Sequence, residues 1–200
     1  AFQAAAIKNR YAVRFRAFQG GKARDEEPVA DDVEEEVRSS VVDAPPELER
    51  EMAALLKFKT STLTQFGLQR TGVWGDETAS QRVEHLGLMF GALTASPRSG
   101  VRGFGVDLDC LCMAILVFPP VWDWYLQWRE QRRGFFTKWE ADMLALLSSL
   151  VRVDTGWIRQ TPSLAGRLRP IDGLISEADI ATARADWGAA CDAMYTHARQ

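Results

Sequence analysis

Apolar residues recur every three or four positions along most of this chain, which is the spacing of one face of an α-helix. The first stripe predicts an amphipathic helix over residues 2–18, ended by the glycine pair at positions 20 and 21. The apolar members of the stripe are Ile7, Tyr11, Phe15 and Phe18. Basic side chains lie mostly off the stripe, so this helix would have one apolar and one cationic face.

The same periodicity continues to the end of the chain. Helices are expected over about residues 46–59, 78–95, 107–118, 121–133 and 138–153, with a short one at 163–168 and a last one from 176 onwards. Three capping boxes mark expected starts, namely Thr78–Gln81, Thr137–Glu140 and Ser176–Asp179. No segment shows the strict alternation of a half-buried strand. The sequence therefore predicts an all-α fold, a multi-helix bundle.

The small net charge of −3 conceals a strong asymmetry along the chain. Residues 1–24 carry six cations and no acids, residues 25–51 carry twelve acids against two cations, and residues 52–200 are nearly balanced. The acidic segment has few aromatic residues and closes on two prolines, which is typical of a flexible linker. We therefore expect an amphipathic basic helix at 1–24, an acidic flexible arm at 25–46, and a helical core domain at 47–200.

Cysteine usage and hydropathy narrow the class of protein. Three cysteines are an odd number, which argues against a disulfide framework and fits a reducing cytosol. Cys110 and Cys112 lie far in sequence from both histidines, so no metal site is expected. No run reaches the roughly eighteen apolar residues that a membrane-spanning helix requires. These features predict a cytoplasmic protein without a metal or cofactor.

The stretch from residue 122 to residue 139 combines four tryptophans with four cations. Arg129, Arg132 and Arg133 share one helical face, and a turn at Gly134 would bring a hydroxyl and a further cation to the start of the next helix. Such a helix start, with free amides, is a favourable phosphate site. We predict contacts with the phosphate backbone of duplex DNA. The predicted set is Arg129, Arg132, Arg133, Thr137 and Lys138, with Arg98 and Arg102 as a second cluster. The alternative is an ordinary helical core with a solvated basic rim.

Residues 78–160 resemble the N-terminal, core-binding half of the tyrosine recombinases, the phage-integrase family. The matching motifs, in order, are Leu86-Gly-Leu-Met-Phe-Gly-Ala-Leu93, Tyr125-Leu-Gln-Trp-Arg129, Arg133-Gly-Phe-Phe-Thr137, Leu146-Leu-Ser-Ser-Leu150 and Gly156-Trp-Ile158. The resemblance implies a small helical bundle that holds DNA for site-specific recombination, in a bacterial cytoplasm.

The chain departs from that family in its chemistry. Family members use two arginines, a lysine, a His-x-x-Arg motif and a nucleophilic tyrosine on a downstream catalytic domain, and the tyrosine attacks a DNA phosphate. Here His197 is followed by Gln200 where an arginine is needed, and none of the three tyrosines lies in the required motif. The resemblance thus implies a DNA-holding part of a longer protein, without catalytic residues of its own.

A rival interpretation is a helical adaptor that binds a protein partner and no nucleic acid. In it, the helix at 2–18 and the acidic arm recruit the partner or a second copy of the chain, and the tryptophans are core residues. The balanced charge of residues 52–200 favours this rival, because dedicated DNA-binding domains usually have a pI above about 9.

Overall fold

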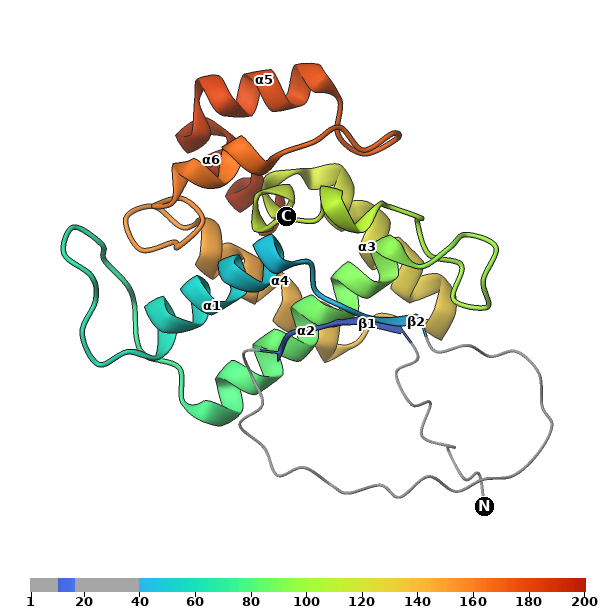
Figure 1. Ribbon diagram of the computed structural model, residues 1–200, viewed down its shortest axis with the longest axis horizontal. Coiled ribbons are helices and arrows are strands. Elements are labelled where there is room, and N and C mark those ends of the chain that lie inside the picture. The colour runs from blue at the N-terminus through green and yellow to red at the C-terminus, as the bar shows by residue number, and fades with distance from the viewer. Residues whose placement is uncertain (1–10, 17–39) are drawn as a thin grey trace.

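The computed structural model describes residues 11–16 and 40–200, and Figure 1 shows them as a bundle of helices. The all-α prediction is confirmed at the level of fold class, since helices dominate the described residues. The α-helices are α1 (Pro46–Thr60), α2 (Asp76–Thr94), α3 (Pro119–Arg133), α4 (Lys138–Val151), α5 (Glu177–Ala185) and α6 (Trp187–His197). Shorter 3-10 helices are η2 (Leu108–Cys110), η3 (Met113–Val117) and η4 (Pro162–Arg167).

Two short strands, β1 (Tyr11–Arg14) and β2 (Ser40–Asp43), pair in parallel, with Tyr11 opposite Ser40. The predicted helix at 2–18 is therefore wrong over residues 11–14, and its other parts lie largely outside the described residues. The predicted arm at 25–46 is likewise wrong at its end, where β2 and the start of α1 lie. Tyr11, Val13 and Phe15 are buried, whereas Ala12 is half-buried and Arg14 and Arg16 are exposed, so the alternation of a strand was present in the sequence.

Strand β1 lies directly on α2, and two glycines of that helix make the close approach possible. A Cβ atom on Gly91 would lie 2.4 Å from the Cα atom of Ala12. A Cβ atom on Gly87 would lie 2.6 Å from the carbonyl oxygen of Val13. These distances are shorter than any real carbon contact, so only glycine fits at both positions. Gly87 and Gly91 are one turn apart and thus line one face of α2.

The segment before α3 was predicted as one helix over 107–118 but forms two 3-10 turns instead. The backbone is extended between them, at Cys112. The buried carboxylate of Glu51 provides a hydrogen-bond partner for this non-helical backbone, because the N–H of Met113 donates to Oε2 of Glu51 at 2.6 Å. Arg167 binds the other oxygen of Glu51 at 3.2 Å. The non-helical backbone at the centre of the bundle is thus paired by side chains from α1 and η4.

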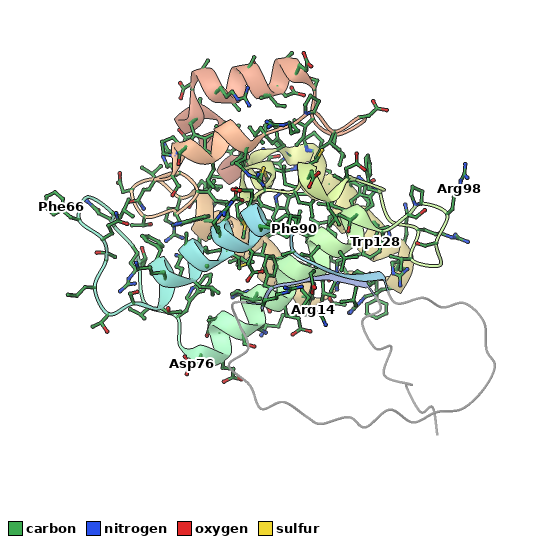
Figure 2. All side chains as sticks on the ribbon, viewed as in Figure 1. Arg14, Phe66, Asp76, Phe90, Arg98 and Trp128 are labelled. Carbon is green, nitrogen blue, oxygen red and sulfur yellow. The ribbon has the colours of Figure 1, made fainter. Side chains whose placement is uncertain are left out.

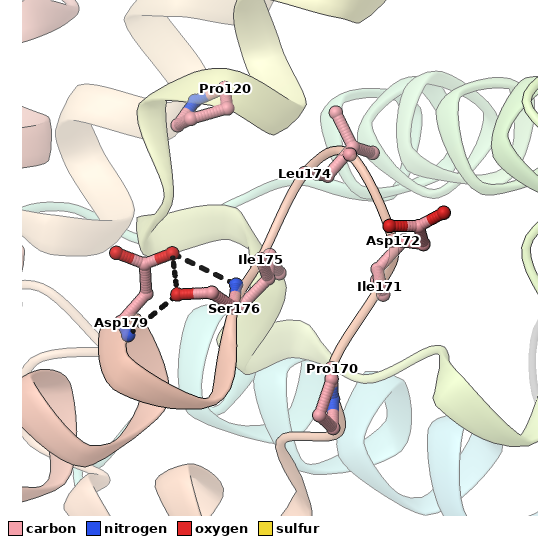
Figure 3. A pocket seen from close by; sticks show the side chains of 9 residues that line it. Pro120, Pro170, Ile171, Asp172, Leu174, Ile175, Ser176 and Asp179 are labelled. Atoms are coloured by element: carbon pink, nitrogen blue, oxygen red, sulfur yellow. Dashed lines mark hydrogen bonds between the residues drawn. The ribbon is translucent and has the colours of Figure 1, made fainter.

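Predicted helix starts are confirmed at two of the three capping boxes. Thr137 and Ser176 each accept a backbone hydrogen bond and receive the reciprocal one, as Figure 3 shows for Ser176 and Asp179. The third box is wrong, because α2 already begins at Asp76, after Gly75. The last predicted helix is divided at Asp186, whose side chain caps α6. Among the described residues, no helix has both the length and the apolar character needed to cross a membrane.

Candidate nucleic-acid interface

The C-terminal end of α3 and the loop after α2 meet at one corner of the bundle. The indole N–H of Trp128 donates to the carbonyl oxygen of Arg102 at 2.9 Å and lies 3.2 Å from that of Val101. The guanidinium of Arg132 also donates to Val101, at 3.0 Å. The two cation clusters that the sequence predicted separately are therefore brought together by tertiary contacts. Trp128 itself is buried.

Five exposed cations lie on the segments that meet here and at the start of α4, and we call them the basic corner: Arg98, Arg102, Arg132, Arg133 and Lys138. Figure 2 shows Arg98 pointing outwards from its loop. Within residues 11–16 and 40–200, the side chains of Arg98, Arg102, Arg133 and Lys138 make no ion pair or hydrogen bond. Their charges are thus available to an external anion.

Arg132 is the most rigidly held member of the basic corner. Its guanidinium lies 4.9 Å from the ring centre of Trp128 and 5.4 Å from that of Tyr11. Contacts with both aromatic rings, together with the bond to Val101, fix the orientation of the planar group. An arginine has five N–H donors, so a group held through one of them can present others to a phosphate.

Arg129, which was predicted to share this surface, is instead a core residue. Its side chain is only 3% exposed, and its Nε atom lies 2.5 Å from a carboxylate oxygen of Glu140. The guanidinium also stacks on Trp139, 4.8 Å from the ring centre. Sequence spacing correctly placed Arg129 on the face of Arg132 and Arg133. The packing of α4 against α3 covers that part of the face, so Arg129 cannot reach a phosphate outside the protein.

Thr137 also has a different role from the predicted phosphate contact, because it caps α4. Its hydroxyl group bonds the carboxylate of Glu140, its own N–H donates to the same carboxylate at 2.8 Å, and its oxygen accepts from Trp139 N at 3.2 Å. Burial alone would raise the pKa of Glu140, but the bonds from Thr137 and Arg129 hold that pKa below its ordinary value. A negative charge from the chain itself therefore occupies the start of α4, where we had expected a phosphate.

A neutral imidazole packs against the start of α4. His85 of α2 is fully buried, and its ring centre lies 3.9 Å from that of Trp139. Neither ring nitrogen has a hydrogen-bond partner within the described part of the chain. Burial lowers the pKa of His85 from 6.5 to about 4. His85 is thus an uncharged core residue at neutral pH.

The sequence interpretation missed two aromatic residues at this corner. Phe135 and Phe136 are 62% and 57% exposed, in the short connection between α3 and α4. The sequence did contain a signal for this exposure, because a connection this short cannot turn two adjacent bulky side chains into the core.

The rest of the described surface offers less defined sites. An open pocket of about 550 Å³ lies between Pro120 and the turn at residues 170–176. Figure 3 shows the side chains that line it. The carboxylate of Asp179 at its edge is bound by the Ser176 cap. All three cysteines are free, and no group of three or more metal-ligating side chains occurs among the described residues.

Comparisons with family models, with characterised proteins and with solved structures found no match for this chain.

Proposed function

We propose that this chain is a helical DNA-binding module that holds the phosphate backbone at the basic corner. One observation carries the proposal. Trp128 and Arg132 tie the loop at residues 101–102 to the end of α3, and so gather cations from two distant parts of the sequence. A cluster of exposed guanidinium groups on a rigid support suits phosphate, which arginine binds in a bidentate manner.

The resemblance to the core-binding half of tyrosine recombinases extends this proposal to a role. The chain would hold duplex DNA during site-specific recombination in a bacterial cytoplasm, and the phosphoryl-transfer residues would lie on another domain. Binding through the backbone positions a protein on DNA but reads little sequence. The basic corner would therefore supply affinity rather than sequence recognition.

Salt dependence of duplex binding tests the proposal directly. Each neutralised phosphate contributes about −0.9 to the slope of log K against log salt concentration. We expect the Arg133→Ala/Lys138→Ala variant to bind duplex DNA more weakly, with a slope reduced in magnitude by about 2. Both side chains are exposed and unpaired in the described structure, so the fold should survive. Fluorescence anisotropy with a labelled duplex across a salt series gives the slope.

A matched control removes one arginine and one lysine elsewhere. Arg152 follows the C-terminal end of α4, about 20 Å from its start at a rise of about 1.5 Å per residue, and Lys57 is exposed on α1. The Lys57→Ala/Arg152→Ala variant should keep the wild-type slope. Equal slopes for both double variants, or no duplex binding by the wild type at low salt, would refute the proposal.

The adaptor function remains the second candidate because of a separate surface. Phe66 is fully exposed and Leu63 nearly so, in the loop between α1 and α2. The guanidinium of Arg70 binds the carbonyl oxygens of Phe58, Ser61 and Thr62, and so holds this loop in place. Exposed apolar side chains on a fixed loop are typical of contacts with another protein. Failure of DNA binding in the salt series would leave this candidate.

A further inference from the structure

The connection between α3 and α4 displays two phenylalanines, and we call residues 134–137 the aromatic turn. Both ends of the turn are fixed. Gly134 adopts a left-handed conformation, with φ of 79°, and its N–H donates to the carbonyl oxygen of Glu130 at 2.6 Å. At the other end, Thr137 forms the capping box of α4. Phe135 and Phe136 are therefore held out by a rigid support and are not part of a loose loop.

Exposure of two adjacent phenyl rings is unusual in the described structure. The other strongly exposed large apolar residues there are Leu63, Phe66, Val73, Leu108 and Val153, and no two of them are neighbours in sequence. The aromatic turn is also flanked by cations, since Arg132 and Arg133 precede it and Lys138 follows it. Two phenyl rings thus lie between cations within seven residues.

We propose that the basic corner prefers DNA with unpaired or unstacked bases to intact duplex, and that Phe135 and Phe136 stack on those bases. The proposal rests on the proposed function, because the flanking cations would hold the phosphates on either side. An aromatic ring can stack on any base, whatever its identity, but in an intact duplex the faces of the bases already stack on one another. A ring must then separate two base pairs, whereas a bulge or a single strand offers a free face.

The composition of the corner favours nucleic acid over a lipid surface. Four of its five cations are arginines, whose planar groups match phosphate bidentately and also stack on bases. Membrane-surface segments instead present a broad apolar face along a helix. Here only the two rings of the aromatic turn are apolar, and they lie between two helices.

The test uses three fluorescent DNAs of equal length: an intact duplex, the same duplex with a two-nucleotide bulge, and a single strand. The wild type should bind the bulged duplex at least about fivefold more tightly than the intact one, since each stacked base contributes about that factor or more. The Phe135→Ala/Phe136→Ala variant should lose this preference and keep its affinity for intact duplex within about twofold. The Leu63→Ala/Phe66→Ala variant, which removes exposed apolar groups elsewhere, should behave as the wild type.

The outcomes separate this inference from the proposed function. Arg133→Ala/Lys138→Ala should weaken binding to all three DNAs. Duplex binding that depends on these cations, without any preference for the bulge, would overturn the role of the aromatic turn and leave the DNA-binding function intact. A preference for the bulge that persists in Phe135→Ala/Phe136→Ala would overturn it as well. Binding to vesicles of anionic phospholipid that requires both phenylalanines, without a preference for the bulge, would assign the aromatic turn to a lipid surface instead.

Discussion

The ion pair between Arg129 and Glu140 should contribute strongly to stability and not at all to DNA binding. Both side chains are almost completely buried, and the atoms that join them are 2.5 Å apart. Removing one member of such a pair leaves the other charge without compensation in the core, at a cost of about 3–5 kcal/mol. Glu140 also closes the capping box of α4, so a substitution there must preserve the cap.

Glutamine at position 140 can still accept the bond from the N–H of Thr137, because Glu and Gln both serve in capping boxes. Glu140→Gln then removes the charge alone, and we expect unfolding to become easier by about 3 kcal/mol. Arg129→Met should lower the free energy of unfolding by about the same amount or slightly less, since Thr137 still binds the remaining carboxylate. In the double variant neither charge is left unpaired. Its loss of unfolding free energy should therefore be smaller than the sum of the losses of the two single variants by about 2 kcal/mol or more.

Urea unfolding followed by circular dichroism gives the three free-energy changes, and a constant slope with urea shows that they are comparable. Anisotropy with labelled duplex is measured under conditions in which Arg129→Met remains folded. Under those conditions, the salt slope of Arg129→Met should equal that of the wild type. An Arg129→Met variant that is as stable as the wild type, but whose salt slope falls by about 1, would mean that this arginine contacts DNA and that its buried position is incorrect.

Three further predictions concern the core. Because burial lowers the pKa of His85 from 6.5 to about 4, the neutral form is favoured in the folded state. Stability should fall by up to about 3 kcal/mol as the pH drops from about 6.5 to about 4, and His85→Leu should remove this part of the pH dependence in urea titrations. Burial likewise lowers the pKa of Lys59 from 10.5 to about 8, so stability should rise between those pH values, and thermal unfolding of Lys59→Met should lack that rise. Gly91→Ala should destabilise the protein by about 2 kcal/mol or more, because the added methyl group meets the backbone of Ala12, whereas Gly166→Ala should be nearly neutral in the same denaturation assay.

Much of the helical architecture follows from local sequence. The capping boxes at Thr137 and Ser176 and the end of α3 at Gly134 were predicted and are present. These features depend on groups within one or two turns of a helix, so the residues that make them are neighbours in sequence. Strand β1 was missed because a short stripe can fit both periods, and β2 was missed because its residues were included in the predicted acidic arm. Only the pairing of β1 with a distant β2, over the glycines of α2, selects the extended form.

The sequence by itself determined that the end of α3 carries arginines on one face, followed by a turn and a capped helix. Only the tertiary structure decided what each arginine does. Arg129 is covered because α4 brings Glu140 and Trp139 against it, whereas Arg132 stays exposed because its neighbours are a loop and a strand edge. Helical spacing fixes the direction of a side chain from its own axis but not what packs opposite. That is set by contacts between segments far apart in the chain, which periodicity does not encode.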